Sequence, residues 1–476
     1  MVNLNVLSQR YASEPINEIF SETGKVIAER ELWISVMKAQ KELGMNIPSK
    51  DIEKFEAAKK DVNLNLIKEI EIRTQHDIKA NIDAFVITAG AGEYLHQGMT
   101  SRDLSDNVEQ MQIRRASQIV FGKYVSVARH FADKSREYES IVLTARTHHQ
   151  AAQPTLLGRR FSMWGEELME HLQAFEIFIK NYPLRGIKGP VGTQFDMLTL
   201  LGDKGKVEEL ERRVAKGLGF DKTLHSTGQV YPRSLDFNLI SDLALLSSAC
   251  ENFAKGIRLM AGYELVTEGF KEGQVGSSAM PHKMNTRSAE RVCGFGELLK
   301  MYADGASRLS GDQWEEGDVS CSVVRRVIIP DAFYTSDGLC ETALTVLNKM
   351  GAYPVIIDRE TDRYLPFLAT TEILAVAVEA GMGREKAHAV IKKHAVGEAL
   401  RMRQYGTEKN NLAALLAEDP AFIERGIARD RIESILSDKP HFVGNAREQI
   451  ARVCDRIHAL TSRYQEEASY EPGEIL

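Results

Sequence analysis

The stretch LISDLALLSSACENFAKGIRLM, residues 239–260, indicates the fold class of this chain of 476 residues. Its apolar residues repeat every seven positions in two series, Leu239, Leu246, Phe253 and Met260, and Leu243, Cys250 and Ile257. Two such series form the a and d seam of a helix that packs in a bundle. Proline is absent between Pro232 and Pro281, and this gap leaves room for a helix of roughly 35 residues, about 50 Å long.

Other segments carry helical patterns too. Between residues 155 and 182 an apolar stripe consists of Trp164, Leu168, Leu172, Phe175 and Ile179. Residues 106–138 combine apolar positions with many charges, and long alternating patterns typical of strands are absent. We therefore expect an all-α fold with a central bundle of long helices, which other copies of the chain complete. The alternative is a monomeric helical protein with curved helices.

The apolar pattern of the long helices breaks at two places, and these breaks predict that the chain is divided into three domains. We expect a smaller N-terminal helical domain at residues 1–104, a central long-helix bundle domain at residues 105–355 and a C-terminal helical domain at residues 356–476. At the end of the chain, SYEPGEIL (469–476) is expected to be a loosely held tail.

The charge balance argues against several classes of protein. Acidic residues outnumber basic ones, 67 to 60, and the formal net charge is −7. Proteins that bind nucleic acid or membrane surfaces favour a basic surface, so neither partner is expected.

The five cysteines form no C-x-x-C pair, and the N-terminus lacks the apolar core of a signal peptide. A cytoplasmic location is therefore expected.

Four short segments are rich in polar residues that carry chemistry: TQHDIKA (74–80), HQGMTSRD (96–103), ARTHHQAAQPT (145–155) and GQVGSSAMPHKMN (273–285). Taken singly, they have ordinary structural explanations. Thr100, Ser101 and Asp103 are typical helix caps, and the adjacent histidines at 148 and 149 point in different directions on regular backbone. Because no acidic or cysteine partner is spaced to complete a metal set with them, no metal is expected.

In combination, these segments resemble a known superfamily. GSSAMPHKMN resembles the signature of the fumarase/aspartase superfamily, whose members eliminate fumarate from a succinyl group. TSRDLSDN and ARTHHQAAQPT are similar to its two other signature regions, in the expected order. Within this superfamily, QRYASEP, TQHDIKA and DVSCSVVRRVIIPD resemble the adenylosuccinate lyase family. The resemblance implies three helical domains in a homotetramer, active sites assembled from three subunits, and no cofactor.

The implied reaction is a β-elimination that releases fumarate from adenylosuccinate, leaving AMP, and from SAICAR, leaving AICAR. Removing a proton beside a carboxylate adds charge to an anion, so the site needs donors where that charge develops. Lys283 and Asn285 suit this task as a point cation and a neutral donor. By resemblance Ser277 is the base, with Ser278 the less favoured choice, in a loop that closes and excludes water.

The departing nitrogen needs an acid, and histidine titrates nearest to neutral pH. By resemblance this acid is His148, and Glu290 is the candidate that orients its ring. The resemblance places further substrate contacts at His76, Asp77, Thr100, Ser101 and Gln229.

A nucleotide monophosphate needs paired, charge-assisted hydrogen bonds, which arginine supplies. By resemblance the phosphate ligands are Arg10, Tyr11, Ser322 and Arg326. Arg325 remains an alternative to Arg326. The chain departs from the family pattern at Gln75 and Gly317, where many members have arginine.

Two alternatives remain. Another fumarate-releasing lyase, of the argininosuccinate or aspartate type, would not need the phosphate ligands. A structural or assembly protein on the same scaffold would have lost the residues of the reaction, whereas Ser277, Lys283, Asn285 and His148 are all present.

Overall fold

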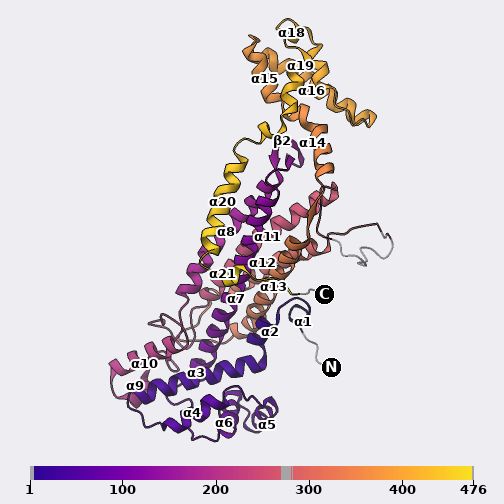
Figure 1. Ribbon diagram of the computed structural model, residues 1–476. Helices are drawn as coiled ribbons and strands as arrows, with labels where there is room; N and C mark the ends of the chain where they lie inside the picture. The colour runs from indigo at the N-terminus through magenta and orange to yellow at the C-terminus, as the bar shows by residue number, and fades with distance from the viewer. Residues whose placement is uncertain (1–4, 270–279, 281, 474–476) are drawn as a thin grey trace.

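The computed structural model describes residues 5–269, 280 and 282–473. Five long helices lie side by side in an elongated bundle (Figure 1). They are α7 (Ser101–Glu137), α8 (Leu157–Asn181), α11 (Ser234–Gly262), α12 (Arg287–Leu309) and α13 (Cys321–Lys349). Helix α11 packs against α8, α12 and α13, and α7 packs against α8 and α13. The predicted all-α class is confirmed.

The seam that the sequence predicts lies in the core of this bundle. All seven of its residues, from Leu239 to Met260, are at most 2% exposed. Burying each such side chain contributes about 1.5–3 kcal/mol relative to leaving it in water. The helix is 29 residues long, shorter than expected, because the chain turns at Tyr263 into a short strand.

The first two helices, α1 (Val6–Arg10) and α2 (Glu14–Phe20), lie against the side of the bundle at α13 and α7 (Figure 1). Six others gather at one end of the bundle: α3 (Glu22–Glu42), α4 (Ser49–Ala58), α5 (Leu64–Thr74), α6 (Asp77–Ala89), α9 (Phe195–Leu201) and α10 (Lys204–Gly217). Helix α3 packs against α10 within this end and joins the end to the bundle through its contacts with α7.

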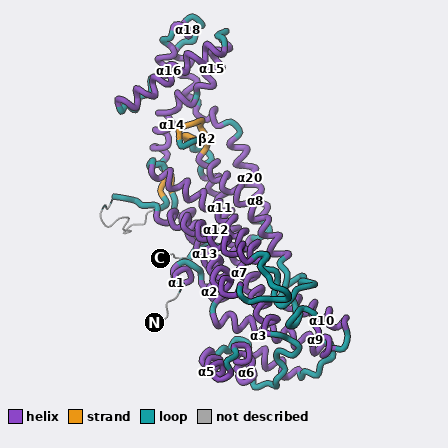
Figure 2. The backbone as a smooth tube through the Cα atoms, turned by 180° about the vertical axis from the view of Figure 1, so that it is seen from behind, coloured by secondary structure: helices purple, strands orange, loops and turns teal. Residues whose placement is uncertain are grey.

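Strands occupy only two small places in the described chain (Figure 2). β1 (Val142–Thr147) and β2 (Gln150–Leu156) form an antiparallel hairpin, and β3 (Val266–Thr267) pairs with β4 (Gly351–Ala352). The hairpin is not predicted by the sequence pattern. Its turn consists of His148 and His149, both with positive φ, and histidines lack the Asn-Gly signal that marks most such turns.

The C-terminal region forms a core of its own between residues 373 and 435, and then returns to the bundle. Its helices are α14 (Pro354–Leu368), α15 (Thr370–Glu379), α16 (Arg384–Tyr405), α17 (Leu412–Ala417), α18 (Pro420–Ile423), α19 (Arg429–Ser437), the 3-10 helix η1 (Lys439–Val443), α20 (Ala446–Thr461) and α21 (Gln465–Ala468). Helices α20 and α21 lie along α7. The limits of the three expected domains stay a prediction.

The prediction of a loose C-terminal tail is wrong for residues 469–473. The carbonyl of Tyr470 accepts a hydrogen bond from the Ser126 hydroxyl at 2.8 Å, and the Gly473 N–H donates to the Glu341 carboxylate at 2.7 Å. Tyr470 also bonds Glu341 through its hydroxyl. The tail is ordered because it supplies donors to a buried carboxylate, a contact that composition does not reveal. Among the described helices, none is both long and apolar enough to cross a membrane.

Candidate active site

A cavity of about 490 Å³, here called the N-terminal cleft, opens where the first helices meet the starts of α7 and α13. Its lining includes three of the predicted substrate residues, Asp77, Ser101 and Arg326. They come from segments far apart in the sequence. The fold therefore brings part of the predicted site together within one chain.

Two helix starts supply backbone donors at this cleft. Helix α6 begins at Asp77, and the His76 ring accepts the Lys79 N–H at 3.3 Å as its N-cap. Helix α7 begins at Ser101, where Thr100 and Asp103 form a reciprocal capping box. Thr100 therefore caps helix α7, which is the structural explanation that its sequence context offers. Free N–H groups at the start of a long helix attract anions.

Arg325 and Arg326 occupy different environments at the start of α13. The buried Arg325 guanidinium pairs with Asp236 at 2.6 Å and with Glu109 at 2.7 Å. Arg326 is exposed, lines the cleft and makes no ion pair with any other described residue. Of the two, Arg326 is the arginine whose charge is available to a ligand.

Glu29 is a buried carboxylate in the wall of the same cleft. Burial raises the pKa of Glu29 from its ordinary value of 4.5 to about 7. Lys25, with its Nζ 3.8 Å from the carboxylate, opposes the shift, and Asp77 adds to it. The protonation of Glu29 therefore changes the charge of the cleft near neutral pH.

Tyr11 lies against the first turns of α12. Its ring packs edge-on against Phe295, with 5.1 Å between ring centroids, and the Arg291 guanidinium lies over it at 5.1 Å. A Cβ on Gly338 would come within 2.8 Å of the Tyr11 Cβ, so only glycine allows this approach to α13. Arg291 was not among the predicted residues, although its position next to Glu290, shortly after the signature segment 273–285, was a usable signal.

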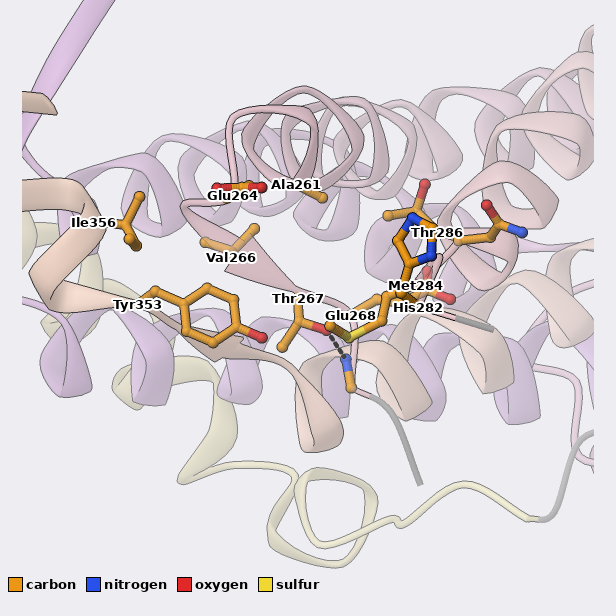
Figure 3. Close-up of a pocket in the computed structure, with 12 residues that line it drawn as sticks. Ala261, Glu264, Val266, Thr267, Glu268, His282, Met284, Thr286, Tyr353 and Ile356 are labelled. Carbon is orange, nitrogen blue, oxygen red and sulfur yellow. Dashed lines mark hydrogen bonds between the residues drawn. The ribbon is translucent and has the colours of Figure 1, made fainter. Parts of the chain in front are cut away.

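Asn285 lines a second cavity, of about 460 Å³, between the end of α11 and the start of α12 (Figure 3). Figure 3 shows His282 and Thr286 at one end of this cavity and Tyr353 at the other. The Glu268 carboxylate accepts the N–H groups of Ser288 and Ala289 at 3.1 and 3.0 Å. These bonds fix the start of α12.

Two predicted catalytic residues, Lys283 and Glu290, are exposed beside this second cavity. The predicted base Ser277, and Ser278, lie outside the described residues. Their positions therefore stay predictions.

His148 is exposed at the tip of the β1–β2 hairpin, with φ 49°. Strand β1 is anchored by Arg146, which pairs with Glu360 on α14 and lies 4.3 Å from the centre of the Tyr263 ring. His149 bonds the Tyr263 hydroxyl at 3.2 Å. His149 thus holds the hairpin in place, while the His148 ring has no hydrogen-bond partner in the described part of the chain, Glu290 included.

Gln229 and Gly317 lie in contact. The Gln229 N–H donates to the Glu316 carbonyl at 2.5 Å, and a Cβ on Gly317 would lie 2.7 Å from the Gln229 Cβ. The glycine at position 317, where the resemblance predicts arginine, is therefore matched by local packing. Ser322 is half-buried in the first turn of α13, four residues before Arg326.

The predicted residues form separate groups rather than one site in a single chain. Ser101 begins α7, and the hairpin that carries His148 follows its end at Glu137. A helix of 37 residues spans about 55 Å. The N-terminal cleft and His148 are too far apart to act on one small molecule within one copy of the chain. Among the described residues, no cluster of three or more His, Cys, Asp or Glu side chains is arranged to hold a metal ion.

Comparisons with known proteins identify relatives of the whole chain. A family model described as "Lyase" matches residues 13–296, and one described as "Adenylosuccinate lyase C-terminus" matches residues 366–453. The adenylosuccinate lyase of Saccharomyces cerevisiae is 34% identical over 453 residues, 94% of this chain and 92% of that protein. The adenylosuccinate lyase of Schizosaccharomyces pombe is 33% identical over 450 residues, 93% of this chain and 92% of that protein.

Solved structures support the same fold. The 3-carboxy-cis,cis-muconate lactonizing enzyme of Pseudomonas putida matches with a TM-score of 0.81 and 18% identity, covering 96% of this chain and 99% of that one. A fumarate lyase from Mesorhizobium sp. BNC1 matches with a TM-score of 0.79 and 19% identity, covering 95% and 99%.

Proposed function

This chain belongs to the adenylosuccinate lyase family of carbon–nitrogen lyases, and from that premise we propose that it cleaves adenylosuccinate to fumarate and AMP. The same elimination converts SAICAR to AICAR. The observation that carries the proposal is the N-terminal cleft, where Arg326 is exposed while Arg325 is already paired. In a chain with net charge −7, a local cation of this kind attracts an anionic substrate.

The phosphate end of the substrate is assigned to Arg326, Ser322 and the Arg10–Tyr11 pair. Arginine binds phosphate oxygens through paired, charge-assisted hydrogen bonds. Arg291, which stacks on Tyr11, adds a second cation next to that pair. These groups come from two regions of the chain, the N-terminal cleft and the start of α12.

The succinyl end is assigned to Ser101 and the start of α7, with His76, Asp77 and Gln229 as further contacts. The Thr100 hydroxyl already caps α7, so we assign Thr100 the task of orienting the helix start. The N–H groups of that first turn then bind a carboxylate.

In the reaction, the Ser277 alkoxide takes the proton from the carbon beside the carboxylate and becomes a neutral hydroxyl. The electron pair forms the carbon–carbon double bond of fumarate, and the bond from carbon to nitrogen breaks. His148 protonates the departing nitrogen, with Glu290 orienting the ring. Lys283 and Asn285 stabilise the charge that develops on the carboxylate. No step uses a metal or cofactor.

We propose a homotetramer, because the groups lie too far apart in one chain. Large apolar side chains are exposed on the bundle helices: Leu245 and Leu259 on α11, and Val323 and Val327 on α13. Exposed apolar surface of this kind is typical of subunit interfaces.

The five free cysteines are consistent with a reducing compartment, and a cytoplasmic location is part of the proposal.

The proposal is tested by incubating the purified protein with adenylosuccinate, argininosuccinate and aspartate in parallel, and by measuring fumarate in each. We expect fumarate and AMP from adenylosuccinate alone. Fumarate from argininosuccinate or aspartate instead would contradict the phosphate assignments. The absence of fumarate from all three would contradict the proposed activity.

A further inference from the structure

The last described residues cross the bundle and end on α13, close to α1 (Figures 1 and 2). The Ala468 carbonyl accepts the Arg129 Nε–H at 2.7 Å, and the Ser126 hydroxyl donates to the Tyr470 carbonyl at 2.8 Å. Glu471 accepts a hydrogen bond from Asn348 at 2.8 Å. This segment, residues 468–473, is called the C-terminal clasp below. It lies beyond the part of the chain that the C-terminal family model matches.

The clasp ends on a buried group of charges. Lys123 on α7 pairs with Asp337 and, at 2.6 Å, with Glu341, both on α13. All three side chains are at most 5% exposed. Glu341 also accepts the Tyr470 hydroxyl and, at 2.7 Å, the Gly473 N–H. Lys123 carries one positive charge and faces two carboxylates. The clasp therefore supplies two hydrogen-bond donors to the second of these, Glu341.

The same group holds the N-terminal segment. The Ser13 N–H donates to Asp337 at 2.6 Å, and Lys123 donates to the Ser13 hydroxyl at 3.0 Å. Ser13 is the N-cap of α2 and lies two residues after Tyr11. Lys123 has three protons to donate, and its three partners are Asp337, Glu341 and Ser13.

We propose that Tyr470 and Glu341 are positioning residues for substrate binding, acting through Lys123 and Ser13 on the Arg10–Tyr11 pair. This inference rests on the proposed function, in which that pair binds the substrate's phosphate. Without the Tyr470 hydroxyl, Glu341 draws Lys123 more strongly, and the lysine's bonds to Ser13 and Asp337 weaken. The C-terminal clasp thereby helps to hold the Arg10–Tyr11 pair in the position that binds phosphate.

The test is the variant Tyr470→Phe, which removes one hydroxyl and keeps the ring beside Lys123. The matched control is Tyr464→Phe, because the Tyr464 hydroxyl also bonds a carboxylate, Glu176 on α8, at 2.7 Å. We expect Tyr470→Phe to raise the KM for adenylosuccinate about fivefold or more while kcat changes less than about twofold. Tyr464→Phe leaves both constants unchanged.

Inhibition by the two products, AMP and fumarate, distinguishes a specific effect on phosphate binding from a general loosening of the structure. With Tyr470→Phe, we expect the inhibition constant of AMP to rise in step with KM, while that of fumarate stays the same, because fumarate carries no phosphate. The variant Glu341→Gln removes the charge that competes for Lys123, so it should lower KM and the inhibition constant of AMP together. An equal rise for both products, or no difference between Tyr470→Phe and Tyr464→Phe, would overturn the inference. Failure of the wild-type protein to release fumarate would instead overturn the proposed function.

Discussion

Arg325 and Arg326 are adjacent at the start of α13 and lie in opposite environments. The guanidinium of Arg325 is balanced by Asp236 and Glu109, whereas that of Arg326 faces the N-terminal cleft. The sequence alone left both open as phosphate ligands, because a pair of adjacent arginines does not show which one a buried carboxylate neutralises. The difference depends on Asp236 and Glu109, which are 89 and 216 positions away in the sequence.

The variant Arg326→Ala is expected to raise KM for adenylosuccinate by roughly tenfold or more with little change in kcat, because it removes binding that substrate and transition state share. Steady-state kinetics measure both constants. Arg325→Ala is the comparison: it leaves buried carboxylates uncompensated and should cost about 3–5 kcal/mol in the free energy of unfolding. Equal losses in kcat and KM for Arg326→Ala would contradict a role in binding.

Glu29 gives the cleft a pH dependence. Its pKa is 4.5 in ordinary surroundings and about 7 in the folded chain, raised by burial. Between these two values the folded state binds more protons than the unfolded state, so stability falls as pH rises from about 4.5 to 7.

The variant Glu29→Gln removes the free-energy cost of ionising this buried carboxylate in the folded state. We expect it to be more stable than the wild type at pH 8, by up to about 3 kcal/mol, and to show little advantage at pH 4.5. Denaturant unfolding at the two pH values measures the difference, with Glu31→Gln on the same helix as a control. A stability difference that does not change with pH would contradict the raised pKa.

At the scale of single elements, long helices were predictable and short irregular segments were not. The heptad series identified α11 because its period is a local property of the chain, and the burial of all seven residues confirms it. The hairpin was missed because β2 contains a single β-branched residue and a proline, and because the turn uses two histidines in place of Asn-Gly. The tail was predicted wrongly because its partners lie on α7 and α13.

Helix α13 carries a prediction of its own at Gly338. An alanine there would place a Cβ 2.8 Å from the Tyr11 Cβ, so the N-terminal segment must move away. We expect Gly338→Ala to lower the melting temperature and to raise KM, with an overpacking cost of about 1–3 kcal/mol.

The control for this variant is Gly397→Ala in α16, where nothing lies within 4 Å of the added Cβ. That change should stabilise the protein by about 0.5–1 kcal/mol, since alanine favours helix, and should leave KM unaltered. If both variants behave alike, the approach of Tyr11 to Gly338 has no bearing on substrate binding.

At the scale of the whole molecule, the residues predicted for the site lie in separate groups within one chain. Sequence motifs predict which residues belong to the reaction, because each motif is a contiguous stretch of the chain. They did not show that His148 and Ser101 lie at opposite ends of α7, since that depends on the length of one helix. The length of α7 is also the physical reason for expecting several copies of the chain in each active site.

Light scattering in solution tests the assembly. We expect a mass about four times the chain mass of 53.3 kDa. Placing a charge at the exposed apolar position Leu259, as in Leu259→Glu, should dissociate the assembly and abolish activity together. A fully active species with the mass of one chain would contradict the shared site.

The most direct test of the account combines two inactive variants. His76→Asn keeps a side chain that caps α6, and His148→Gln leaves the hairpin in place, yet each removes a histidine from a different group of the site. We expect each variant alone to release almost no fumarate from adenylosuccinate. When the two are co-expressed and assemble together, sites that take His76 from one copy and His148 from another regain both residues, and roughly one quarter of wild-type activity returns. If mixed assemblies form and no activity returns, the two histidines do not meet across copies, and the shared active site is contradicted.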